Sequence, residues 1–193
     1  MASSVEFSIS IDIDHIKRRL PFTAKILDYG CGYGRISRLL KDAGYENIIG
    51  YDTSPGMIER GQRENPDLVL RHNETFELPE PSERFDAAIV AAVFTSLPDE
   101  SMQAMVLKEM NRILNNAGVL ILCEFLRDDQ RQYDAKGCFV SKIGIRMKHF
   151  HESEIRSLLH GWDIIHFERL KTEAIGRSMV PAVHVIAHSS HNK

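Results

Sequence analysis

The chain has few of the residues that would cross-link a fold or carry it into a membrane. It holds only three cysteines, Cys31, Cys123 and Cys138, which are odd in number and widely separated. Such a set fits neither a disulfide framework nor a paired zinc motif, so we expect reduced thiols. No apolar run approaches the roughly 20 residues that cross a bilayer, and charged residues interrupt the N-terminal stretch where a signal peptide would need an apolar segment. We therefore expect a cytoplasmic protein with no membrane partner.

An excess of basic charge is also lacking. Lys and Arg number 24 against 27 Asp and Glu, a formal net charge of -3. Affinity for a polyphosphate backbone would have to come from a local patch, so nucleic acid is not favoured as a partner. The 43% of hydrophobic residues are enough for one core. With no internal repeat and no linker, residues 1–193 are predicted to form a single domain.

Short apolar runs alternate with amphipathic segments along the chain. Strands are expected at 25–30, 47–52, 67–72, 85–92 and 119–125, and helices at 35–44, 54–63 and about 102–113. The inner helix faces are expected to carry Ile36, Leu39, Leu40, Ala43, Met102, Met105, Val106, Met110 and Ile113. Apolar strands separated by such helices require a parallel sheet that is covered on both faces. The pattern predicts an α/β, doubly wound fold.

The last third of the chain breaks this rhythm. Residues 127–149 are polar and irregular, which predicts a lid or substrate loop, and a helix is expected at 151–161. Two strands, 162–170 and 181–188, are joined by a loop that contains Gly176 and is too short for a crossover helix. They are predicted to pair antiparallel.

Three glycines on alternate positions end the first predicted strand, in the stretch KILDYGCGYGRISRLL. At the carboxyl edge of a doubly wound sheet, Gly30, Gly32 and Gly34 would let the backbone approach a ligand beside a helix N-terminus. The dinucleotide fingerprint G-x-G-x-x-G would require glycine or alanine where this chain has Arg35. The match is to G-x-G-x-G instead.

This spacing, with Asp28 before it and Asp52 at the end of the second strand, resembles motif I of the class I S-adenosylmethionine-dependent methyltransferases. The segment FDAAIVAAVFTSLPD resembles the family's stretch after strand four, and the likeness covers nearly the whole chain. It implies a Rossmann-like methyltransferase fold, with a seven-stranded, mostly parallel sheet and an antiparallel last strand. It also implies S-adenosylmethionine as the cofactor.

The resemblance implies roles residue by residue. The glycine loop would pack against the methionine and ribose of the cofactor, Asp28 would lie near its amino group, and Asp52 would accept from both ribose hydroxyls. In the family an Asp after strand three often meets the exocyclic amine of the adenine. This chain reads RHNETFELP there, so Asn73 or Glu74 would take that role. The predicted cofactor-binding residues are Asp28, Gly30, Cys31, Gly32, Gly34, Asp52, Thr53, Met57, Asn73, Glu74, Ala91 and Ala92.

Methyl transfer from a sulfonium is an in-line displacement that needs mainly alignment and exclusion of water. Candidates for a base are Tyr133, Glu124 and His149, of which we select His149 as the catalytic residue. The acceptor would lie between residues 7–20 and 127–149, a space that suits a small molecule. The passage FHESEIRSLLHGWDII also loosely resembles the tail of small-molecule methyltransferases, including the thiopurine and tellurite types.

Other functions stay open beside this one. An RNA or protein methyltransferase is the second reading, because four basic residues lie in the segment 127–149: Lys136, Lys142, Arg146 and Lys148. A non-catalytic methyltransferase-like binding module is another, since fold alone does not establish activity. A nicotinamide-dependent oxidoreductase is disfavoured by Arg35. The oligomeric state is left undetermined.

No metal site is expected from the histidines. His184 and His188 would share one face of a strand but lie more than ~13 Å apart by the strand rise. His149 and His151 flank a predicted helix start, where capping or exposure accounts for them.

Overall fold

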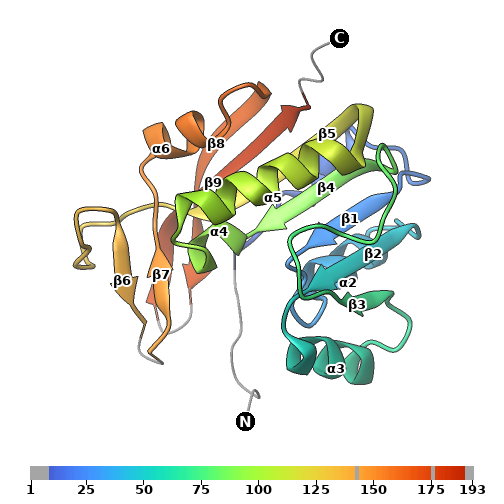
Figure 1. Cartoon of the computed structure of the whole chain (residues 1–193), viewed down its shortest axis with the longest axis horizontal. Helices are drawn as coiled ribbons and strands as arrows, with labels where there is room; N and C mark the ends of the chain where they lie inside the picture. The colour runs from blue at the N-terminus through green and yellow to red at the C-terminus, as the bar shows by residue number, and fades with distance from the viewer. Residues whose placement is uncertain (1–8, 142–143, 175–176, 190–193) are drawn as a thin grey trace.

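The computed structural model describes residues 9–141, 144–174 and 177–189, and shows one seven-stranded sheet with helices on both faces (Figure 1). The strand order is β3-β2-β1-β4-β5-β9-β8. The strands are β1 (Ile26–Tyr29), β2 (Ile48–Asp52), β3 (Leu70–His72), β4 (Phe85–Ala91), β5 (Leu114–Phe125), β8 (Asp163–Ala174) and β9 (Arg177–His188). Pairs among β1 to β5 are parallel, while β9 runs antiparallel to both β5 and β8. The predicted doubly wound sheet with an antiparallel last strand is confirmed.

Most of the helices pack into two apolar cores, one on each face of the sheet. The helices are α1 (Ile13–Lys17), α2 (Arg35–Asp42), α3 (Pro55–Glu64), α4 (Val93–Ser96), α5 (Glu100–Ile113) and α6 (Glu152–Leu158). Buried side chains of α4, α5 and α6 belong to one core and those of α1 and α2 to the other, while Ile58 of α3 lies in a third, smaller cluster. In Figure 1, α5 crosses the front of the sheet. Helix α3 begins as predicted, with Pro55 in its first turn and the Ser54 side chain accepting from the Met57 amide.

Some predicted helix faces are wrong. Leu39, Met102 and Met105 are 37%, 40% and 53% exposed. The buried face of α5 instead includes Gln103 and Glu109, whose polar atoms are hydrogen-bonded. The prediction is right at five other inner positions, which are buried: Ile36, Leu40, Val106, Met110 and Ile113. Polar side chains with partners can replace apolar ones in a core, because a satisfied hydrogen bond removes the cost of burial.

Two segments differ from the sequence prediction. Strand β5 begins at Leu114, and its ladder with β4 skips from Leu114 to Val119, so residues 115–118 form an irregularity inside the strand. The segment 127–149, predicted to be irregular, contains an antiparallel pair, β6 (Cys138–Val140) and β7 (Arg146–Lys148). Residues 7–8 of the predicted acceptor-binding segment, Lys142 of the predicted lid and Gly176 of the predicted connecting loop lie outside the described residues.

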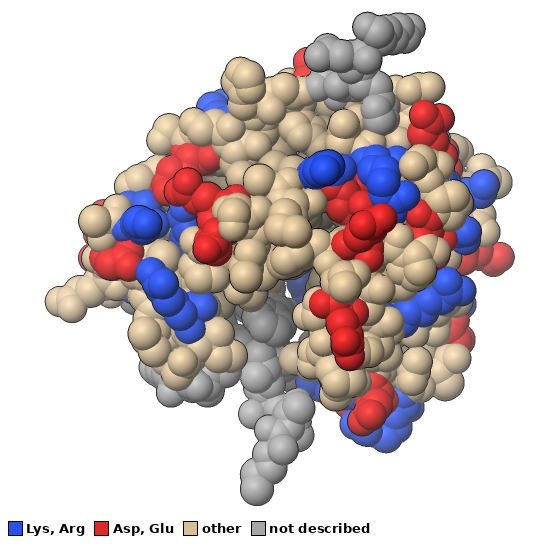
Figure 2. Space-filling view, viewed as in Figure 1, with Lys and Arg blue, Asp and Glu red and all other residues tan. Residues whose placement is uncertain are grey.

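The surface carries charge of both signs. On the face seen in Figure 2, Lys and Arg lie interspersed with Asp and Glu, and neither sign forms one continuous area there. Among the described residues, none of the helices has the length and apolar character that a bilayer crossing requires.

Candidate functional site

A cavity of about 290 Å³ lies at the carboxyl ends of β1, β2 and β4. Strand β1 pairs with β2 on one side and with β4 on the other, so the loops that follow these strands diverge. This is the switch point at which doubly wound sheets bind ligands. The lining comes from the glycine-rich loop, the start of α3, the loop after β3 and the segment around α4.

The glycine-rich loop needs its glycines for two reasons. Gly30, Gly32 and Gly34 have φ values of +70°, +56° and +86°, in the left-handed region that disfavours side chains. A Cβ on Gly30 would also lie 2.5 Å from Cγ2 of Val93. The loop is fixed to β2, because the Gly30 amide donates to the Tyr51 carbonyl at 2.8 Å. The backbone therefore turns tightly at the edge of the cavity.

Asp52 joins the glycine loop to α3. Its Oδ2 accepts from the Gly32 amide at 2.8 Å, and its Oδ1 accepts from the Ser54 amide at 2.8 Å. Asp52 is half-buried and is the one carboxylate in the described part of the lining. A carboxylate offers about four lone-pair positions, so two bonds leave each oxygen able to accept from a further donor.

Asp28 has a different environment. It is buried, and its Oδ2 accepts from the amide and the hydroxyl of Ser37 at 2.9 and 2.7 Å. Burial raises the pKa of this carboxyl to about 6, although the Ser37 bonds act in the opposite direction. Asp28, Gly34 and Glu74 are outside the cavity lining. The predicted residues that do line it are Gly30, Cys31, Gly32, Asp52, Thr53, Met57, Asn73, Ala91 and Ala92.

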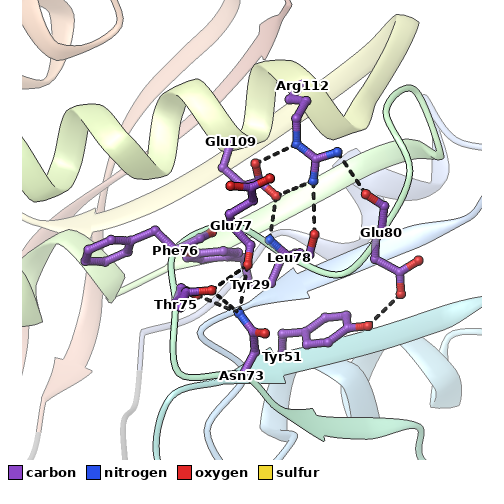
Figure 3. A network of polar contacts seen from close by, with 10 residues as sticks. All are labelled: Tyr29, Tyr51, Asn73, Thr75, Phe76, Glu77, Leu78, Glu80, Glu109 and Arg112. Carbon is purple, nitrogen blue, oxygen red and sulfur yellow. Dashed lines mark hydrogen bonds and ion pairs between the residues drawn. The ribbon is translucent and has the colours of Figure 1, made fainter.

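One wall of the cavity, the loop after β3, is held by a polar network (Figure 3). The Arg112 guanidinium on α5 donates to the Leu78 carbonyl at 3.2 Å, while the Glu109 carboxylate accepts from the Leu78 amide at 2.7 Å. The Tyr29 hydroxyl donates to the Phe76 carbonyl at 3.2 Å. This wall is therefore positioned by bonds from α5 and β1 and needs no ligand to order it.

Sequence reasoning missed about half of the lining. The lining residues outside the predicted set are Tyr29, Tyr33, Arg35, Ile36, Tyr51, Ser54, Thr75, Phe76, Leu78, Val93, Ser96 and Leu97, of which Tyr51 and Val93 directly neighbour predicted residues. Arg35 is the one guanidinium or ammonium in the described lining, and it donates to the Ile9 carbonyl. Its position directly after the glycine loop was a usable signal, since such residues start the helix that borders the site. The loop after β3 carried no comparable signal.

The candidate bases lie elsewhere. His149 is buried, its Nδ1 is 2.9 Å from the Tyr133 hydroxyl, and its ring stacks on Phe125 with centroids 5.4 Å apart. Glu124 is fully buried and accepts from two amides of α4. None of these side chains lines the cavity, and the role of His149 as a base stays a prediction.

Gly61 lets α3 approach the glycine loop. A Cβ at this position would lie 2.5 Å from Cδ1 of Leu70 and 2.7 Å from the Tyr33 carbonyl oxygen. We expect Gly61→Ala to lower the free energy of unfolding by about 2 kcal/mol, the usual cost of overpacking against backbone. Urea denaturation measures this effect. Gly56→Ala in the same helix is the control, because a Cβ there meets nothing within 4 Å; equal stability of the two variants would contradict the close approach.

Comparisons with known proteins agree with this geometry. The family model described as a methyltransferase domain matches residues 27–122. The demethylmenaquinone methyltransferase of Thermotoga maritima is 32% identical over 113 residues, covering 58% of this chain and 48% of that protein. The 2-methyl-6-phytyl-1,4-hydroquinone methyltransferase of a Synechocystis species is 31% identical over 117 residues, covering 58% of this chain and 36% of that protein. The match thus spans less than half the length of these curated relatives.

A solved structure extends the likeness to the whole sheet. A SAM-dependent methyltransferase from Methanosarcina mazei superposes with a TM-score of 0.84 at 24% identity, covering 93% of this chain and 98% of that one. At this identity the likeness concerns the fold. It includes the C-terminal strands, which the family model does not reach.

Proposed function

Because this chain belongs to the class I S-adenosylmethionine-dependent methyltransferases, we propose that it binds S-adenosylmethionine in this cavity and transfers its methyl group to a small-molecule acceptor. The observation that carries the proposal is the Asp52 carboxylate, which lies at the end of β2 with acceptor capacity left on both oxygens. A ribose diol is a neighbouring pair of hydroxyl donors, and a carboxylate can accept from both.

The residues present fit this cofactor. The turn at Gly30, where a Cβ would collide with Val93, leaves room for the ligand to approach the backbone. Arg35 supplies a positive charge for the carboxylate of the methionine part, and Phe76 belongs to the apolar wall available to the adenine. One cavity thus offers an acceptor, a cation and an apolar surface.

Asn73 is the better candidate of the two residues proposed for the adenine amine. It lines the cavity, whereas Glu74 does not. The Asn73 side-chain nitrogen donates to the carbonyls of Thr75 and Glu77 at 2.6 and 3.1 Å (Figure 3). Its amide oxygen is then the atom that can accept from an exocyclic amine.

When bound, S-adenosylmethionine supplies a methyl group that is already activated by the sulfonium charge. The protein must then bind the cofactor and the acceptor, align them and exclude water. These tasks require positioned contacts and few reactive side chains in the lining. The residues that we propose for binding and aligning the cofactor are Gly30, Gly32, Asp52, Asn73 and Ala92.

The acceptor we propose is an aromatic ring of the hydroquinone class. By their names, one of the curated relatives described above acts on a 1,4-hydroquinone and the other on a quinone, the oxidised form of such a ring. The aromatic side chains Tyr29, Tyr33 and Phe76 in the lining support an aromatic neighbour. The interspersed charges seen in Figure 2 do not favour a polyanion. The cytoplasmic location expected from composition is part of the same proposal.

Titration calorimetry of S-adenosylhomocysteine into the full chain tests the cofactor. We expect saturable one-to-one binding with a dissociation constant in the micromolar range, about -8 kcal/mol, and no heat from NAD under the same conditions. Absence of binding would contradict the proposal.

The acceptor class needs a separate test. The enzyme is incubated with S-adenosylmethionine and a panel of hydroquinones with and without a prenyl tail, and product mass is followed. We expect a mass gain of one methyl group on at least one hydroquinone. Cofactor binding without such a product would leave the cofactor site standing and contradict the acceptor class.

A further inference from the structure

Three histidines from distant parts of the chain meet beneath α1. His15 lies on α1, His166 on β8 and His184 on β9. The ring centroids are 4.0 Å apart for His15 and His166, 5.9 Å for His15 and His184, and 5.7 Å for His166 and His184. The cluster belongs to the edge of the sheet formed by β8 and β9, and none of its members lines the cofactor cavity.

Strand pairing adds a carboxylate to this cluster. His184 is the register partner of Glu168, and His166 precedes Glu168 by two residues on the same strand. Alternate residues of a strand share a face, and register partners lie side by side on it. One ligand atom from each of His166, Glu168 and His184 can be chosen so that all lie within 4.8 Å of one another. The pair His166 Nε2 and Glu168 Oε2 is 3.4 Å apart.

Four imidazole nitrogens of this cluster lack a hydrogen bond among the described residues. His184 is fully buried, and both of its ring nitrogens are among the four. The other two are Nε2 of His15 and Nε2 of His166, the latter with the Glu168 carboxylate 3.4 Å away. Buried polar atoms are nearly always paired, so a fully buried side chain with two unpaired nitrogens calls for an explanation. Contact between the rings accounts for their packing and leaves the nitrogen lone pairs unused.

We propose that His166, Glu168 and His184 bind a divalent transition-metal ion of the Zn²⁺ type, with His15 as a further nitrogen donor. Two imidazoles and a carboxylate are a common zinc ligand set. Ligand atoms on a tetrahedral zinc lie roughly 3.4 Å apart, given bonds of about 2.0 to 2.1 Å. Small side-chain rotations would bring the three atoms from their present separation to that distance.

The ion would fasten α1 to the last two strands. The segment before α1 already makes long-range contacts: the Ser10 amide donates to the Thr172 hydroxyl at 3.0 Å, and the Ile9 carbonyl accepts from Arg35 of the cofactor cavity. A metal beneath α1 would hold this segment from its other end. The consequence is a structural ion that stabilises the N-terminal side of the fold.

Metal titration of the full chain, purified without a histidine tag and stripped with a chelator, tests the proposal. Zn²⁺ is titrated in competition with a chromogenic chelator, and Co²⁺ is added separately to report tetrahedral coordination by its visible absorption. Glu168→Gln and His166→Gln are the test variants, because their side chains are 52% and 23% exposed and tolerate substitution better than the fully buried His184. His160→Gln, at an exposed position after α6, is the matched control.

We expect one Zn²⁺ per wild-type chain, at least tenfold weaker binding in each test variant, and unchanged binding in His160→Gln. Excess Zn²⁺ should raise the melting temperature of wild type and not that of the test variants. Binding of S-adenosylhomocysteine by the variants reports that they are folded and is independent of the ion. A wild-type chain that binds no Zn²⁺, or one whose binding survives both test substitutions, would overturn the proposal.

Discussion

Asp52→Ala is expected to weaken S-adenosylhomocysteine binding by more than about 100-fold. Hydrogen bonds to a charged group contribute roughly 1.5 to 3 kcal/mol each, and two ribose hydroxyls would lose their acceptor. The variant also loses the bonds from Asp52 to the Gly32 and Ser54 amides, which hold the glycine loop against α3. Those amides border the cavity and can bind water instead, so we expect the fold to survive. Calorimetry measures the affinity, and thermal unfolding measures the stability.

Asp67→Ala is the matched control for charge. Asp67 is exposed, pairs with Arg38 and Lys41, and lies outside the cavity lining. Its removal changes the net charge by the same amount as removal of Asp52, and we expect cofactor affinity to stay within twofold of wild type. If both variants bind S-adenosylhomocysteine like wild type, the ribose does not lie at Asp52.

The features whose positions were predicted correctly from sequence are those with local signals. The glycine loop, Asp52 and the Ser54 cap of α3 each follow from a few adjacent residues at the end of a strand. The antiparallel pairing of the last two strands followed from their short connection, and the seven-stranded sheet followed from the family resemblance. A signal contained in one segment can be read without knowing what packs against that segment.

The features that were missed depend on partners far away in the sequence. Glu109 is buried on α5 because Arg112 and the Leu78 amide satisfy its carboxylate, so a residue expected at the surface displaces apolar ones. Met102 and Met105 are exposed on the same helix. Helical periodicity counts apolar side chains and has no means of recognising a carboxylate whose charge is matched.

The histidine cluster illustrates the same limit. The expectation from sequence considered only the distance between His184 and His188 along β9. The register of β8 and β9 instead places Glu168 beside His184. Register between two strands is set by the whole sheet, and a single sequence does not reveal it. The expectation of no metal site considered only His188 as the neighbour of His184, and it stays a prediction.

Glu124→Gln is expected to change how stability depends on pH. Glu124 is fully buried on β5, and its oxygens accept from the Phe94 and Thr95 amides at 2.7 and 3.0 Å and from the Thr95 hydroxyl at 2.8 Å. Helix α4 has no side-chain cap of its own, since its N-cap is Ala92 with φ +57°. Glu124 therefore supplies, from a neighbouring strand, the acceptors that an N-cap residue would provide.

Burial raises the pKa of Glu124 from 4.5 to about 7, although its hydrogen bonds act in the opposite direction. Between pH 4.5 and about 7, Glu124 thus stays protonated in the folded protein, whereas it loses its proton in the unfolded chain. The stabilising contribution is complete below pH 4.5 and is lost as pH rises through about 7, by about 3 kcal/mol. The side chain introduced by Glu124→Gln does not titrate, so the free energy of unfolding of this variant lacks this decrease with pH.

Urea denaturation of wild type and Glu124→Gln, at several pH values between about 4.5 and about 8, measures the difference in their free energies of unfolding. The contributions of other titrating groups cancel in that difference. We expect wild type to exceed Glu124→Gln in stability most at the acidic end, with the gap narrowing by about 3 kcal/mol toward the alkaline end. Glu59→Gln, exposed on α3, removes the same charge and should follow wild type throughout. Parallel curves for wild type and Glu124→Gln would contradict the raised pKa. Val93 and Ser96 of α4 line the cofactor cavity, so the helix whose first amides Glu124 accepts from forms part of that wall.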